Sequence, residues 1–131
     1  IVNSVSAEWD RLRALYITTD TLTNTPDLNV IFAANDMMAL GATEAVRTAG
    51  KTGKIMIIGV DGVPDARQAI KAGKLTASIM QFPYLIGKRS AEMAAQAVQG
   101  KINGITERAP LLILTKEVLV ANKNPLLQYV R

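Results

Sequence analysis

One stretch, residues 29–61 (NVIFAANDMMALGATEAVRTAGKTGKIMIIGVD), constrains the fold more than any other part of the chain. Its outer parts, residues 30–34 and 55–58, are apolar at every position. Strands without polar alternation are typical of parallel sheets, in which both faces are buried under helices. Between them, apolar residues recur at the spacing of one helical stripe: Met38, Ala42, Ala45, Val46 and Ala49. The stretch therefore predicts a strand–helix–strand unit of a parallel sheet.

The rest of the chain continues this alternation of strands and helices. The further predicted strands are 1–5, 75–80 and 109–115, with 116–120 as an extension of the last one. The further predicted helices are 11–22, a short one that begins at Pro64, and 83–99. The first of these carries its apolar stripe at Leu12, Leu15, Tyr16 and Thr19, with Ser6 or Asp10 as its N-terminal cap. This order predicts an α/β fold, a doubly wound parallel sheet with helices on both faces.

The composition excludes several classes of function. The chain has 131 residues, enough for one domain with a core, and it contains neither His nor Cys. A Ser-His-Asp or Cys-His nucleophile is therefore excluded within it, and the commonest metal ligand is absent. There is no phosphate loop or dinucleotide fingerprint. The net charge of +4 is scattered rather than grouped, which argues against a nucleic-acid surface. We expect no catalytic residues, no metal and no cofactor.

Four polar or aromatic residues follow four successive predicted strands: Trp9, Asn35, Asp61 and Gln81. In an open parallel sheet, residues just beyond the carboxyl ends of the strands meet at one edge, where ligands bind. A carboxylate accepts strong hydrogen bonds from hydroxyls, and amide side chains both donate and accept. An indole face covers the apolar surface of a flat ring. Together these groups predict a site for a sugar or another polyol.

Each of these residues also has a purely structural interpretation. Trp9 taken alone is more often a core or groove residue. Asn35 and Asp36 both suit the cap of the following helix, which is the role we favour for Asp36. Asp61 before glycine and Gln81 before Phe-Pro are ordinary loop residues. Asp36 and Asp61 are also candidates for a carboxylate pair, but the sequence does not give their separation.

The sequence resembles the type I periplasmic sugar-binding proteins, close to the ribose-binding branch. The matching motifs are AEWDR (7–11), ANDMMALGA (34–42), GVDG (59–62), GKLTAS (73–78) and QFP (81–83). The resemblance extends along nearly the whole chain but covers only the second half of such a protein. It implies a fold of two α/β lobes that are joined by three crossover strands, with the sugar held between the lobes.

The resemblance also implies a division of the chain and a role for each candidate residue. Residues 1–81 and 115–131 would form an incomplete C-terminal sugar-binding lobe, and residues 82–114 would be the crossover helix and strand of the N-terminal lobe. Trp9 would stack on the sugar ring. Hydrogen bonds to the sugar hydroxyls would come from Asn35, Asp61 and Gln81.

The function that this implies is non-catalytic binding of a monosaccharide, a pentose or hexose, for a membrane ABC importer. The chain would hold half of the cleft, act outside the cytoplasm (in the periplasm, or lipid-anchored in a Gram-positive cell), and have no nucleic-acid partner. In the absence of the other lobe, helix 83–99 would pack back on this lobe or mediate swapped self-association.

Two other classes of function remain open from the sequence alone. LacI-type transcriptional regulators bind effector sugars with the same fold, although they more often have Asp-Asp where this chain has Asp61-Gly62. An enzyme on a flavodoxin-like sheet is the third interpretation, and it is disfavoured by the lack of His, Cys and a phosphate loop.

Overall fold

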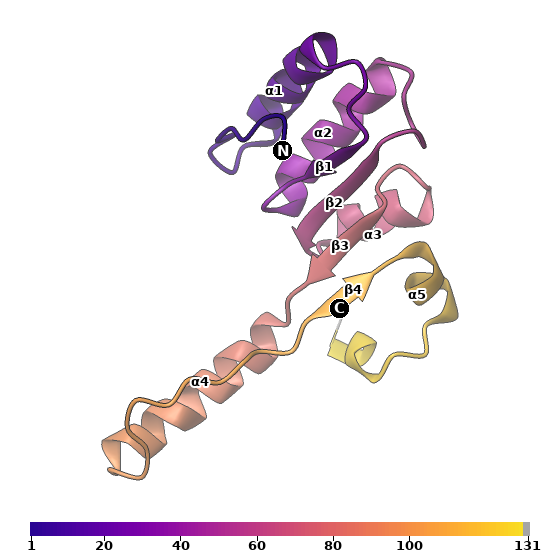
Figure 1. The fold of residues 1–131 in the computed structure, drawn as a ribbon. Helices are drawn as coiled ribbons and strands as arrows, with labels where there is room; N and C mark the ends of the chain where they lie inside the picture. The colour runs from indigo at the N-terminus through magenta and orange to yellow at the C-terminus, as the bar shows by residue number, and fades with distance from the viewer. Residues whose placement is uncertain (130–131) are drawn as a thin grey trace.

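A computed structural model describes residues 1–129 (Figure 1). The helices are α1 (Arg11–Asn24), α2 (Asp36–Thr48), α3 (Pro64–Lys71), α4 (Pro83–Val98) and α5 (Lys116–Ala121), followed by a 3-10 helix (Pro125–Tyr129). The strands are β1 (Val30–Phe32), β2 (Met56–Asp61), β3 (Ala77–Met80) and β4 (Leu112–Leu114). The predicted strand–helix–strand unit is confirmed as β1, α2 and β2, and the α/β class is confirmed with it.

The four strands form one sheet in the order β1-β2-β3-β4. The first three are mutually parallel, as predicted, whereas β4 pairs antiparallel with β3. The cause of this reversal lies in the path of the chain between them. After β3 the chain leaves the sheet along α4, and residues 99–111 then return beside that helix (Figure 1). The chain re-enters the sheet at the end from which β3 left it, so β4 runs in the opposite direction.

The core lies between one face of the sheet and the helices α2 and α3. Helix α2 contacts β2, α1 and α3, while α3 contacts β3 and α5. The side chains that are almost fully buried include Val46, Ile57, Ile70, Leu75, Phe82 and Leu114. Alternate residues of each strand therefore supply this core, as the two-residue period of a strand requires.

Part of the opposite face of the sheet is exposed, so the prediction that the strands are buried on both faces is wrong for the residues of that part. Phe32 is 63% exposed, and Val30, Met56 and Ile113 are exposed as well. The strand register places these residues on the same face of the sheet. Among residues 1–129, the helices that contact the strands cover the other face. The strands formed by the continuous apolar runs, residues 30–34 and 55–58, therefore have helices over only one of their two faces.

Helix α4 projects away from the sheet (Figure 1), and no residue in it is buried. Arg89 pairs with Glu107 of the returning segment and with Glu92 of the same helix. Near the start of α4, Leu85 packs against the core and the ring of Tyr84 stacks on that of Tyr129. Within residues 1–129, no helix has the length and apolar character needed to cross a bilayer.

Three local predictions are wrong. Residues 1–5 form no strand, and their apolar side chains are exposed. Residues 116–121 form a helix rather than extending β4, because Thr115 caps it by accepting a hydrogen bond from the Val118 amide. In α1 the buried residues are Ala14, Thr18 and Leu22, so Leu12 and Tyr16 of the predicted stripe face solvent.

Candidate functional site

The three candidate residues that follow β1, β2 and β3 lie at the carboxyl edge of the parallel strands. Asn35 comes three residues after the end of β1, Asp61 is the last residue of β2, and Gln81 directly follows β3. Because these strands are parallel neighbours, their carboxyl ends meet at this edge. The topology thus accounts for the proximity of residues that are as many as 46 positions apart in the sequence.

Asp61 and Gln81 are in direct contact. The Gln81 Nε2 donates a hydrogen bond of 2.8 Å to Asp61 Oδ1. The Gln81 amide also donates to the Asp61 carbonyl oxygen at 3.3 Å, which continues the pairing of β2 with β3. Asp61 has a φ of +116°, a value that residues other than glycine rarely adopt. Strained backbone of this kind persists where the surroundings hold it, and it is enriched at ligand sites.

Asn35 is the N-cap of α2. Its Oδ1 accepts a hydrogen bond of 2.8 Å from the Met38 amide, so the structural interpretation of Asn35 is confirmed. Capping uses the oxygen of the side chain, and the Nδ2 group is the part that can donate to a ligand. The two roles of Asn35 are therefore compatible, since they use different atoms.

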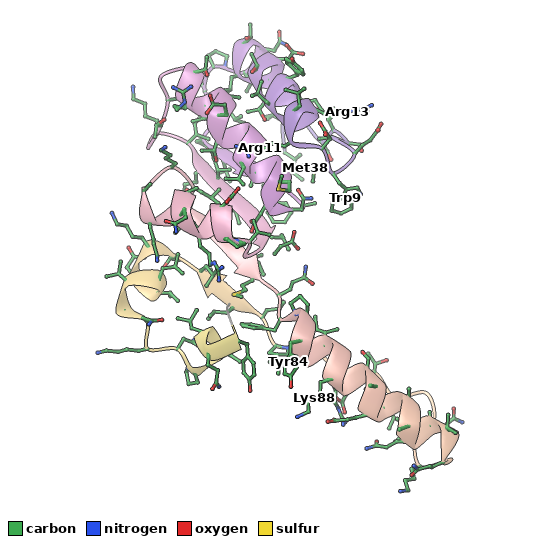
Figure 2. All side chains as sticks on the ribbon, turned by 180° about the vertical axis from the view of Figure 1, so that it is seen from behind. Trp9, Arg11, Arg13, Met38, Tyr84 and Lys88 are labelled. Carbon is green, nitrogen blue, oxygen red and sulfur yellow. The ribbon has the colours of Figure 1, made fainter. Side chains whose placement is uncertain are left out.

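Trp9 lies in a turn that immediately precedes α1. It has a φ of +62°, and the neighbouring Glu8 has a φ of +51°, so two successive residues are in the left-handed region. Asp10 caps α1 by accepting a hydrogen bond from the Arg13 amide, as predicted. Trp9 is 67% exposed. Figure 2 shows its side chain projecting from the end of α1, with Met38 of α2 nearby. Trp9 is not a core residue in this structure.

Asp36 is not the cap of α2, in contrast to the role that we favoured from the sequence. Its side chain is fully buried at the first position of the helix. Asp36 Oδ2 accepts hydrogen bonds from the amides of Gly62 at 2.7 Å and Val63 at 2.8 Å, and Oδ1 accepts one from the Ser78 hydroxyl at 2.7 Å. Burial raises the pKa of Asp36 above its ordinary value, these hydrogen bonds oppose the rise, and the charge of Asp61 adds slightly to it.

The predicted site does not include this network, although two features of the sequence indicate it. Gly59 interrupts the apolar run of β2, and glycine inside a strand often marks a close approach of another group. Ser78 is likewise the polar residue within the apolar strand β3, and it is fully buried. Both residues face the carboxylate of Asp36 in the structure.

Asn35, Asp61 and Gln81 are half-buried at the carboxyl edge of the sheet. Two hollows on the described residues lie elsewhere, with volumes of about 290 Å³ beside the end of α4 and about 180 Å³ between α1 and α2. Neither is lined by the four candidate residues. Residues 1–129 contain no cluster of three or more acidic side chains arranged to hold a metal ion. Hydrogen-bonding groups at the carboxyl edge of the sheet, together with the exposed indole of Trp9, suit one side of a cleft.

Several known proteins that resemble this chain bind sugars. Residues 1–102 match the family described as periplasmic binding protein domain. The D-allose-binding periplasmic protein of Escherichia coli is 40% identical over 121 residues, which are 92% of this chain and 39% of that protein. A ribose import binding protein of Bacillus subtilis is 42% identical over 117 residues, 89% of this chain and 38% of that protein. The chain thus spans about two-fifths of the length of these relatives.

Solved structures agree with the fold. A solute-binding protein of an ABC transporter from Actinobacillus succinogenes, with bound D-allose, has a TM-score of 0.84 and 37% identity, and the match covers 92% of this chain and 43% of that chain. Another from Agrobacterium vitis, with bound D-fucose, has a TM-score of 0.85 and 29% identity over 99% of this chain and 44% of that chain. The architecture is therefore that of one lobe of a type I periplasmic binding protein.

Proposed function

Because this chain belongs to the periplasmic binding protein domain family, we propose that it supplies half of the monosaccharide site of a solute-binding protein that serves an ABC importer. The ligand is a pentose or a hexose, and the protein binds it without chemical change. The names of the relatives, which bind allose and ribose, support this class of ligand. A location outside the cytoplasm and a membrane permease as partner follow from the same proposal. The relatives named above give no support to the LacI-type alternative.

The observation that carries the proposal is the contact between Asp61 and Gln81 at the carboxyl edge of the sheet. This hydrogen bond uses one oxygen of Asp61 and one proton of Gln81, which leaves Asp61 Oδ2 as an acceptor and Gln81 Oε1 as a second one. Two acceptors held side by side suit adjacent hydroxyls of one sugar ring. Hydrogen bonds from hydroxyls to a carboxylate are charge-assisted and are about twice as strong as neutral ones.

Trp9 and Asn35 complete the proposed half-site. The exposed indole of Trp9 offers an apolar face to the C–H surface of a sugar ring, and its Nε1 is a further donor. The Nδ2 group of Asn35 donates to a ring hydroxyl while the oxygen of that side chain caps α2. Donors and acceptors are then both present, as hydroxyl groups require.

We further propose that residues 82–114 belong, in the longer protein, to the second lobe of the fold. This division is supported by α4, which has no buried residue and projects from the sheet. The last part of the segment, β4, nevertheless pairs with β3 in this structure. A helix of this kind is stabilised when it packs on another surface, either the second lobe or another copy of this chain by exchange of helix 83–99.

The test of the binding proposal is a sugar titration. Ribose, allose, galactose, glucose and xylose are added separately to the protein while the fluorescence of Trp9, the only Trp, is recorded. Half of a site binds weakly, so the titration is repeated with a chain extended upstream of Ile1. We expect saturation with one sugar. The Asp61→Asn variant should weaken that binding by about tenfold to a hundredfold, the equivalent of about 1.4 to 2.7 kcal/mol, as expected for a charged hydrogen bond.

The matched control for Asp61→Asn is Asp65→Asn. Asp65 is an exposed acid in the first turn of α3, so this substitution removes the same charge close to the site without removing a proposed ligand. Trp9→Phe tests the origin of the fluorescence signal. A flat response to every sugar in the extended chain, or an equal loss of affinity in Asp65→Asn, would sink the assignment of Asp61.

A further inference from the structure

Asp36 connects the two elements that carry Asp61 and Gln81. Its Oδ2 accepts hydrogen bonds from the amides of Gly62 and Val63, the two residues that directly follow Asp61. Its Oδ1 accepts the hydroxyl of Ser78, which lies in β3 three residues before Gln81. The Gly62 amide also donates to Ser78 Oγ at 3.1 Å, which closes the network between the loop and β3. One buried carboxylate thus holds both sides of the contact between Asp61 and Gln81.

The conformation of Asp61 needs such support. Its φ of +116° is unfavourable for a residue with a side chain, and Gly62 follows with a φ of +77°. A residue in such a region is strained, and it persists only where neighbouring contacts fix it. The two backbone N–H groups that donate hydrogen bonds to Asp36 belong to the peptide units immediately after Asp61. These contacts fix the direction in which the chain leaves β2.

The neighbouring strand provides the space for this carboxylate. A Cβ atom at Gly59 would lie 2.3 Å from Asp36 Oδ1 and 3.0 Å from the Cβ of Ala39. Any side chain at position 59 would therefore displace the carboxylate. Helix capping does not explain Asp36, because Asn35 already performs that role. A fully buried carboxylate is costly unless it is hydrogen-bonded, so its three donors indicate a defined structural task.

We propose that Asp36 is a positioning residue that holds the Asp61–Gly62–Val63 loop, and through it the Asp61–Gln81 pair, in the arrangement that receives a sugar hydroxyl. This inference rests on the proposed sugar site for its functional meaning, whereas the geometric part concerns the ligand-free protein. Preorganised ligand groups of this kind lose less freedom on binding than mobile ones.

The test compares four variants with the unaltered chain. Asp36→Ala removes all three acceptor contacts. Asp36→Asn keeps an oxygen for the two amides and presents an NH2 group to Ser78 Oγ, so it should restore the arrangement. Ser78→Ala removes one contact and serves if Asp36→Ala does not fold. Thr43→Val is the matched control, because it removes a buried hydrogen bond within α2, from the Thr43 hydroxyl to the Ala39 carbonyl oxygen, without touching the loop.

The first measurement is the NMR spectrum of the ligand-free proteins, in which the side-chain NH2 signals of Gln81 report its hydrogen bond to Asp61. We expect these signals to move in Asp36→Ala and Ser78→Ala towards the positions of a solvent-exposed glutamine. They should keep their positions in Asp36→Asn and Thr43→Val. Unchanged Gln81 signals in Asp36→Ala, or in Ser78→Ala where that variant is used instead, would overturn the proposal whether or not the protein binds sugar.

The second measurement is the sugar titration with the same proteins, at a temperature at which each is folded. We expect Asp36→Ala to raise the Kd by about tenfold, the equivalent of one lost hydrogen bond, with Asp36→Asn and Thr43→Val close to the unaltered chain. An unchanged Kd in Asp36→Ala would overturn the positioning role and leave the sugar site intact. A lack of binding by the unaltered extended chain would instead overturn the proposed function, and the Gln81 signals would still decide the positioning role.

Discussion

At the scale of single residues, the candidate site combines side chains suited to a sugar with backbone that is costly to form. Trp9 has a φ of +62° and an indole that is largely exposed. A side chain in this region costs about 1–2 kcal/mol relative to glycine. The residue is 67% exposed, so packing of the ring in the free protein offsets little of this cost. The ring is therefore expected to contribute when it covers a ligand.

The first prediction concerns this cost at Trp9. We expect Trp9→Gly to have a free energy of unfolding about 1 kcal/mol higher than Trp9→Ala, because both lack the ring and only glycine relieves the left-handed conformation. Urea unfolding followed by circular dichroism measures the difference. Equal stabilities, or a more stable Trp9→Ala, would show that the turn relaxes out of the left-handed region.

The second prediction concerns the pH dependence that Asp36 gives to stability. Burial raises its pKa in the folded state above the unfolded value of 3.8, so the folded state binds the proton more readily. Stability from this group therefore falls as the pH rises through the interval between the two pKa values. We expect the unfolding free energy of the unaltered chain, relative to Asp36→Asn, to be greater at pH 4 than at pH 7.

The comparison with Asp36→Asn removes the contributions of other carboxyl groups. Hydrogen bonds from Arg47, Arg89 and Thr115 lower the pKa values of Glu44, Glu107 and Glu117, and these groups titrate in both proteins. If the stability of the unaltered chain relative to Asp36→Asn rises with pH, the hydrogen bonds to Asp36 lower its pKa more than burial raises it. Urea unfolding at intervals of pH provides the measurement.

The sequence indicated the edge at which the candidate residues lie but not how buried each would be. Asn35, Asp61 and Gln81 could be placed there because strand ends are recognisable and parallel strands share one edge. Asp36 was misread because adjacent Asn and Asp have similar cap preferences, and the sequence does not show which of the two turns inward. The hydrogen bonds of Asp36 join residues as many as 42 positions apart, which no local pattern reveals.

At the scale of elements, the approach of α1 to α2 positions the turn that carries Trp9. Gly41 lies in the middle of α2, and a Cβ atom there would be 2.1 Å from the carbonyl oxygen of Arg11. The absence of a side chain at Gly41 therefore allows the first turn of α1 to lie directly against α2. Any separation of the two helices at this point would also move Trp9, which is two residues from Arg11.

The third prediction tests this contact with two glycine substitutions. Alanine in a helix is favoured over glycine by about 1 kcal/mol when nothing else changes. We expect Gly87→Ala in α4 not to lower stability, since nothing lies within 4 Å of a Cβ atom there. Gly41→Ala should lower the unfolding free energy by about 1–3 kcal/mol, the usual cost of overpacking. Equal effects of the two substitutions would contradict the close packing of α1 on α2.

The elements predicted correctly are those with strong local sequence signals. The errors arose where contacts with other segments of the chain determine the structure. The glycines that end α2, α3 and α4, which are Gly50, Gly73 and Gly100, all have the positive φ values typical of helix C-terminal glycines. Residues 1–5 have strand-like composition, but a strand needs a neighbour to pair with, and none of the described strands pairs with them. The direction of β4 depends on the path of 31 residues between β3 and β4, which composition does not encode.

At the scale of the whole molecule, two large surfaces lack cover among the described residues. One is the part of the sheet face that carries Val30, Phe32, Met56 and Ile113, and the other is most of α4, in which no residue is buried. Most of the stability of a helix in a protein comes from packing of its apolar face. Apart from Leu85, which packs on the core, and Tyr84, which stacks on Tyr129, helix α4 thus depends on its own hydrogen bonds and on the exposed ion pairs of Arg89. Exposed ion pairs of this kind stabilise a protein only weakly.

The fourth prediction follows from this contrast between α4 and α2. Amide hydrogens exchange quickly where few buried contacts oppose local opening. We expect the amides of α4 to exchange far faster than those of α2, whose residues Ala39, Ala42 and Val46 are buried. Hydrogen–deuterium exchange at low protein concentration measures both helices in one sample. Protection of α4 that rises with protein concentration would indicate packing between copies of the chain, as helix exchange requires. Protection equal to that of α2 at high dilution would contradict the inference that few buried contacts stabilise α4.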